Sequence, residues 1–292
     1  MNHYLMFYGI LIAVVRPAIV IAILTGLWLV LQRATLPPRR RVTTWLAVAI
    51  PLVVWLALIW MLAAAGVFEF GRIRIPLIPL AVILPPVIGL TLLTRSDRIA
   101  TALDAAPSAW LVGIQVYRVI GANFLALWAY GAIPGVFALP AGIGDFLVGL
   151  LALPVAFYLA SGAAHGRAIA VAWNVLGVAD LVNAVILGVL SSPGPLQHLA
   201  LDHPNVLAAT YPTVMTPAFA VPLSLILHGL SLWQLRRRQT CGRYGSIKDD
   251  AAIEGSASSQ IKLSHSHHPK QSRMELGLRL SRQFRGPNDL DC

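Results

Sequence analysis

Seven long apolar stretches, separated by short polar loops, occupy most of the first 238 residues and restrict the fold more than any other feature. A helix needs about 20 apolar residues to cross the hydrocarbon core of a bilayer. The composition agrees, because 57% of the 292 residues are hydrophobic and only 12% are charged, about half the charged share of soluble domains. A soluble enzyme is therefore excluded, and we predict an all-α, polytopic transmembrane helix bundle. The expected spans are residues 4–31, 44–65, 75–93, 110–132, 142–160, 168–190 and 218–235.

The arginines of the connecting loops are distributed unevenly, which predicts an orientation. The even-numbered loops hold only Arg72 and Arg74. The odd-numbered loops hold Arg33, Arg39, Arg40, Arg41, Arg95, Arg98 and Arg167. Because basic loops stay in the cytoplasm, we expect the N-terminus outside and the C-terminus inside, in a bacterial inner membrane. Lys and Arg together number 22 against 12 acidic residues. We interpret this excess as a sign of orientation and contact with anionic lipid, not with nucleic acid, since no nucleic-acid-binding motif accompanies it.

The composition changes near residue 239, which divides the chain into two predicted parts. Residues 1–238 form the transmembrane domain, and residues 239–292 are rich in Ser, His, Lys and Arg. Such a segment has too little apolar surface to fold on its own, so we expect a disordered, basic cytoplasmic tail. Both cysteines, Cys241 and Cys292, lie in it. No disulfide framework or cysteine-based metal site is therefore expected. Residues 205–216, before the last span, fit either a short surface helix or a re-entrant segment.

Ionisable residues within the spans are the main functional candidates, because charge is costly at membrane depth. At 1.5 Å per residue, Arg118 lies roughly 12 Å from the cytoplasmic edge, Asp180 roughly 19 Å and Asp145 about 22 Å. The carboxylates thus share one level, within reach of Arg118, and we expect an ion pair with one or both. The predicted polar core consists of Arg118, Asp145, Asp180, Arg16, His228, Gln115, Asn174 and Asn183.

Spans five and six share a local pattern around their aspartates. Gly142, Asp145 and Gly149 have the same spacing as Gly177, Asp180 and Ala184. Spacings of three and four place each set on one helix face. The two spans run in opposite directions, so the pattern fits inverted structural repeats of the kind found in transporters. Coincidence in a chain rich in Gly and Ala explains it equally well.

Several membrane chemistries do not fit the residues present. The stretch 142–145 spells GxGD, as in intramembrane aspartyl proteases, but the preceding span has no second aspartate. All lysines lie in the tail, which removes a retinal Schiff base, and His228 is the one histidine well inside a span, which argues against a bis-histidine haem. No HExxH, GxSxG or P-loop motif occurs. We therefore expect no cofactor, no metal site and, on balance, no enzyme.

The region 115–238 resembles a group of uncharacterised bacterial multi-pass integral membrane proteins. The resemblance rests on Gln115-Val116-Tyr117-Arg118 with Gly121, and on the stretch 134–140 leading into Gly144-Asp145. Trp173-Asn174, Asp180 and the Pro-rich entry to the last span add to it. It implies a bacterial inner-membrane protein and assigns no activity.

Two main interpretations of function remain open. In the first, the polar core moves a small solute, a proton or an ion across the membrane. In the second, the ion pairs are structural and the protein is a non-catalytic scaffold or assembly partner, because buried charge also fixes how helices pack. A lipid-modifying enzyme is a third, weaker interpretation. Beyond the lipid bilayer, the sequence names no partner and no oligomeric state.

Overall fold

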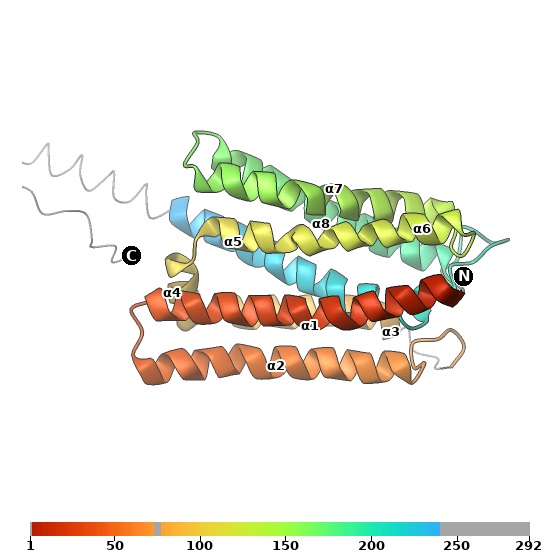
Figure 1. Ribbon diagram of the computed structural model, residues 1–292, viewed down its shortest axis with the longest axis horizontal. Helices are drawn as coiled ribbons and strands as arrows, with labels where there is room; N and C mark the ends of the chain where they lie inside the picture. The colour runs from red at the N-terminus through yellow and green to blue at the C-terminus, as the bar shows by residue number, and fades with distance from the viewer. Residues whose placement is uncertain (1, 73–76, 240–292) are drawn as a thin grey trace, which may run out of the picture. The chain divides into compact units, whose positions relative to one another are not determined.

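The computed structural model describes residues 2–72 and 77–239, and within them it confirms an all-helical bundle with no strand (Figure 1). Among these described residues, seven helical segments are long and apolar enough to cross a membrane. The first three are α1 (Asn2–Arg33), α2 (Pro38–Ala64) and α3 (Leu77–Thr94). The next are α7 (Gly135–Ala160), α8 (Gly166–Ser191) and the final span, Thr216–Gln239. The remaining span lies between α3 and α7 in the chain.

That fourth span, Ser108–Ala129, is built from three consecutive pieces. The helix α5 (Ser108–Gly113) leads into a 3₁₀ segment, η1 (Ile114–Ala122), which continues as α6 (Asn123–Ala129). The short helix α4 (Asp97–Ala105) precedes it and is capped by Ser96, whose hydroxyl accepts a hydrogen bond from the backbone N–H of Ile99. A side-chain acceptor at this position satisfies an N–H that the first helical turn leaves open.

Several span boundaries differ from the sequence prediction, and α2 begins at Pro38 instead of residue 44. The helix α7 begins at Gly135, whereas the prediction began this span at residue 142, after Pro140. The structure keeps Pro140 inside the helix. The segment 205–216 is not a surface helix. It contains a single 3₁₀ turn, η2 (Leu207–Ala209), and Asn205, Thr213 and Val214 are buried. This segment folds into the bundle and leads directly to the final span.

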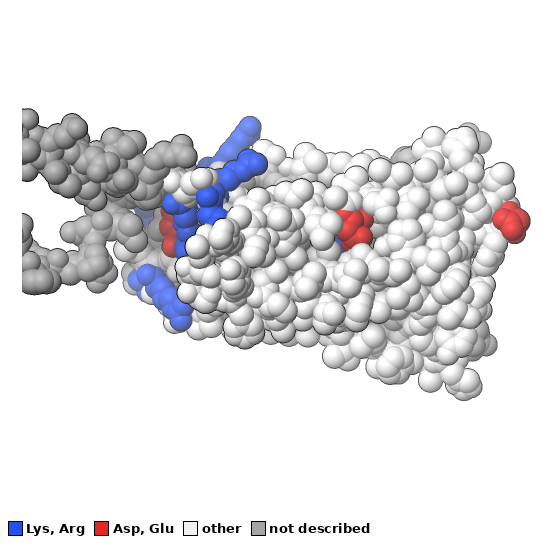
Figure 2. All heavy atoms as spheres, turned by 90° about the horizontal axis from the view of Figure 1, so that it is seen from above, with Lys and Arg blue, Asp and Glu red and all other residues white. Residues whose placement is uncertain are grey.

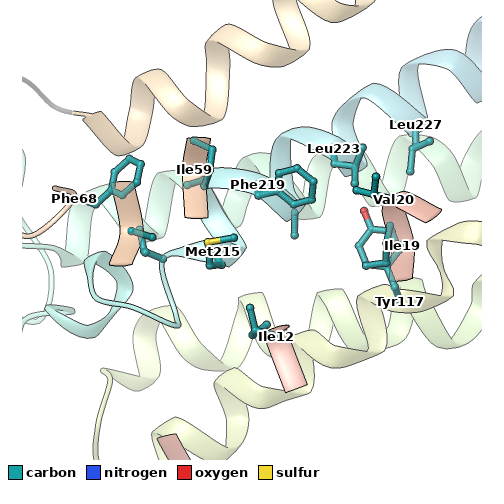
Figure 3. Close-up of a cluster of buried hydrophobic side chains, with 14 of the residues drawn as sticks. Ile12, Ile19, Val20, Ile59, Phe68, Tyr117, Met215, Phe219, Leu223 and Leu227 are labelled. Atoms are coloured by element: carbon teal, nitrogen blue, oxygen red, sulfur yellow. The ribbon is translucent and has the colours of Figure 1, made fainter. Parts of the chain in front are cut away.

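The final span is the central helix of the bundle. In its most apolar window 67% of the residues are buried, against 11% to 44% in the other six spans. Figure 3 shows Phe219, Leu223 and Leu227 of this span in one apolar cluster with Ile19 and Val20 of α1. Side chains four residues apart share one helix face, so a single row of this helix supplies one side of the core.

The outer faces of the helices are apolar, as a bilayer requires. Leu150 and Phe157 of α7 and Leu176 of α8 are well exposed. The α1–α2 loop, α4 and the α7–α8 loop lie at one end of the bundle (Figure 1). Lys and Arg on the face shown in Figure 2 gather at that end. This end holds the loops predicted to be cytoplasmic, and the orientation itself stays a prediction.

Two compact units divide the chain at Leu235. The bundle described here belongs to the first unit, Met1–Leu235. The predicted tail, apart from the helix end at residue 239, lies outside the described residues.

Candidate functional site

The 3₁₀ geometry of η1 aligns the residues that begin the site. With three residues per turn, Gln115, Arg118 and Gly121 form one row along this segment. Gln115 and Arg118 are buried, and the Arg118 residue is only 3% exposed. A long 3₁₀ run inside a helix is uncommon and often marks a functional or strained site. Here it directs the guanidinium of Arg118 toward α7, α8 and the final span.

Arg118 is ion-paired with both of the carboxylates that the sequence offered as partners. Its Nη2 lies 2.7 Å from Oδ1 of Asp145 and 2.5 Å from Oδ2 of Asp180. Its Nε also donates to Oδ1 of Asp145, at 2.8 Å. Both carboxylate side chains are close to nine-tenths buried. The guanidinium therefore joins η1 to α7 and α8 in the interior of the bundle.

The third nitrogen of Arg118 extends the network to the final span. Its Nη1 donates to the carbonyl of Gly177, at 3.3 Å, and lies 3.0 Å from Nε2 of His228. Because an arginine cannot accept a hydrogen bond, Nε2 is the acceptor. The proton of a neutral imidazole is then on Nδ1, which donates to Oδ1 of Asn174 at 2.9 Å. Asn174 in turn donates to Ser231.

Glycines leave the space that this cluster occupies. A methyl group at Gly144 would lie 2.5 Å from Cγ of Asp180, and one at Gly121 would lie 2.6 Å from Oδ2 of Asp145. One at Gly177 would lie 2.5 Å from Nε2 of His228. Side-chain carbons do not approach this closely, so the close fit requires glycine at these positions. Part of the pattern shared by the two aspartate spans thus has a local packing reason.

Arg16 and Gln115 lie next to this cluster but bond elsewhere. Arg16 is buried in α1 and donates to Oγ1 of Thr216, at 3.0 Å. Among the described residues it has no carboxylate partner within salt-bridge distance. Gln115 donates to the carbonyl of Ser224. Both residues therefore form hydrogen bonds with the final span. The positive charge of Arg16 offsets the negative charge of the aspartates only at longer range.

One candidate lies outside the cluster. Asn183 was expected among the polar-core residues, but it is exposed on α8. It follows Asp180 by three residues, which turns it about 60° away around the helix. This rotation carries Asn183 from the buried edge to the outer face, and the polar core is corrected accordingly.

A cavity of about 500 Å³ lies beside the cluster. Its walls come from α3, α8, the start of the final span and the segments 67–71 and 192–196. Phe124, Phe137, Leu181 and Val185 line it, as do the buried polar residues Asp145 and Thr216. The α2–α3 loop and the N-terminus lie at the same end of the bundle (Figure 1). Ligand sites typically measure about 300–1,000 Å³ and are mostly apolar with a few polar groups, as this cavity is.

The sequence analysis missed several residues that complete the site. Tyr8 contacts Thr216, Tyr117 bonds to Ser224 at 2.5 Å, and the ring of Trp173 packs on His228 with centroids 5.1 Å apart. A usable signal exists for two serines of the site, Ser224 and Ser231, which bond to Tyr117 and Asn174. Ser224 and Ser231 lie four residues before and three after His228, which is the spacing of one polar helix face.

Comparison with known proteins yields a family. No curated protein and no solved structure matches the chain. Residues 75–236 match a domain family described only as a domain of unknown function, DUF8737. The match covers more than half of the chain and includes Arg118, Asp145, Asp180 and His228, whereas Arg16 precedes it. The chain is therefore a multi-pass membrane protein that belongs to the DUF8737 family.

Proposed function

We propose that this protein binds a small solute within its transmembrane bundle and moves it across the membrane. The observation that carries the proposal is the cavity of about 500 Å³ that extends to Asp145. A purely structural helix bundle has no need of such a space, because protein interiors are otherwise close-packed. The cavity and the charged cluster share Asp145, so a solute in the cavity would lie beside the ion pairs.

The proposed roles follow from the contacts. Arg118 holds Asp145 and Asp180 in fixed positions and would form the rigid floor of the site. The least buried span is α3, with only 11% of its window buried. It supplies one wall of the cavity. We assign to α3 the movement that lets a solute pass, because it is the least buried of these spans.

A second candidate function also has support. Every nitrogen of Arg118 has a partner, and glycines fit closely around those partners. A saturated network of this kind suits a scaffold whose ion pairs fix the helix arrangement. The two functions differ in one property. A solute pathway requires water to enter the cavity, whereas a scaffold does not.

Thiol labelling tests this difference at two neighbouring positions of α8. Val185 lines the cavity, and Ile186 is 51% exposed on the outer face. Each is changed to cysteine in a chain whose Cys241 and Cys292 are replaced by serine. Sealed vesicles of known orientation are then treated with a charged, membrane-impermeant methanethiosulfonate.

Labelling of Val185→Cys from the side of the N-terminus, with Ile186→Cys unlabelled from either side, supports a solute pathway. A Val185→Cys thiol that reacts from neither side contradicts it and leaves the scaffold function.

A further inference from the structure

We infer that the solute accepted by the cavity is a lipophilic cation, an organic cation with a bulky apolar body. The inference rests on the proposed function and adds the chemical class of the solute. Three properties of the cavity support it: the sign of its charged groups, the free side of Asp145 and the character of its walls.

The ionisable side chains that line the cavity, within the described part of the chain, are both acidic. Asp145 is a buried lining residue and Glu69 is an exposed one. Arg118, which pairs with Asp145, and Arg72, of the same loop as Glu69, are not among the lining residues. Among the described residues, the lining of the cavity therefore carries carboxylates and no guanidinium, and Arg16 reaches it only through its hydrogen bond to Thr216. In a medium of low dielectric constant such charges act strongly over several ångströms.

Asp145 keeps one oxygen for a second partner. Both contacts from Arg118 end on Oδ1. In the region that the structure describes, Oδ2 accepts no hydrogen bond. Arg118 also keeps Asp180, the Gly177 carbonyl and His228 as partners. A solute cation can therefore attract Asp145 without leaving Arg118 unpaired. Separating a buried pair completely would be far more costly.

The walls suit an apolar and aromatic body. Phe68, Phe70, Phe124 and Phe137 line the cavity. Aromatic faces attract cations through their quadrupole, and they also bury apolar surface. The lining also includes the buried residue Thr213.

Two ions of nearly the same size and shape but opposite charge provide the test. Tetraphenylphosphonium is a lipophilic cation, and tetraphenylborate is its anionic counterpart. Binding of each to the full-length protein is measured by isothermal titration calorimetry in one detergent, with protein-free micelles subtracted. We expect tetraphenylphosphonium to bind at least tenfold more tightly than tetraphenylborate.

Variants then locate the binding. Val185→Trp fills the cavity and should weaken tetraphenylphosphonium binding at least tenfold, whereas Ile186→Trp, on the outer face, should leave it unchanged. Asp145→Asn should reduce the preference for the cation. Val185→Trp keeps the test decisive if Asp145→Asn does not fold, because it leaves the ion pairs intact.

The outcomes separate this inference from the proposed function. Equal binding of both ions, or tighter binding of tetraphenylborate, overturns the cation class, as does equal loss in Val185→Trp and Ile186→Trp. No binding of either ion, with Val185→Cys still labelled from the side of the N-terminus, also overturns the class but leaves a solute pathway. An unlabelled Val185→Cys contradicts the pathway itself.

Discussion

Replacing Gly144 with alanine should displace Asp180 from Arg118. The added methyl carbon would overlap Oδ1 of Asp180 and would lie 2.5 Å from its Cγ, where ordinary contacts begin near 3.4 Å. The carboxylate must therefore move away from its present position, and its 2.5 Å contact with Nη2 of Arg118 is lost or stretched. Overpacking of this kind costs about 1–3 kcal/mol. The cost approaches about 3–5 kcal/mol if the carboxylate stays charged without its partner.

The measurement is unfolding by sodium dodecyl sulfate in mixed micelles, with Gly26→Ala as the matched control. Gly26 lies within α1 and a methyl group there meets nothing within 4 Å. Its replacement should be neutral or stabilising by about 0.5–1 kcal/mol, because alanine favours a helix over glycine.

A second background isolates the cause. In an Asp180→Ala protein the carboxylate is absent, so Gly144→Ala should cost no more than Gly26→Ala. The reasoning is refuted if Gly144→Ala destabilises the protein equally with and without Asp180, or if it has no effect in the native background.

Three further predictions concern the topology, the tail and the packing of the final span. A reporter fused at His3 should be active only outside the cytoplasm, and one at Arg238 only inside, and a cytoplasmic signal at His3 would reverse the orientation. Deleting the chain after Gln239 should leave the yield of folded, membrane-extracted protein unchanged, and a collapse in yield would show that the tail is needed. Gln234→Leu should destabilise the bundle by about 1–3 kcal/mol, because the buried amide donates to two backbone carbonyls near the end of α4. Detergent unfolding measures this loss, and an unchanged midpoint would contradict it.

Depth along the membrane is the property that the sequence predicts well. A helix rises by 1.5 Å per residue, so counting from a span's end places Asp145 and Asp180 near one level and Arg118 within side-chain reach of them. Their ion pairs follow from that estimate and from the cost of isolated charge in lipid. The structure has these pairs.

Rotation about the helix axis is harder to predict. A span that is apolar on all sides gives little sign of which face is buried, and this is why Asn183 was assigned to the core although it faces outward. The 3₁₀ winding of η1 was also missed, since residues 114–122 read as ordinary apolar helix. The cavity could not be predicted, because it depends on how α3, α8 and the final span pack.

The central claim is that Arg118 couples to both aspartates across three helical elements. Double-mutant cycles of Arg118→Gln with Asp145→Asn and with Asp180→Asn test it, read as free energies of unfolding in the same micelles. We predict that each double variant is more stable than the sum of the single losses implies, by about 0.5–3 kcal/mol, because neutralising an aspartate relieves the charge that Arg118→Gln leaves uncompensated. Strict additivity in both cycles would contradict the claim.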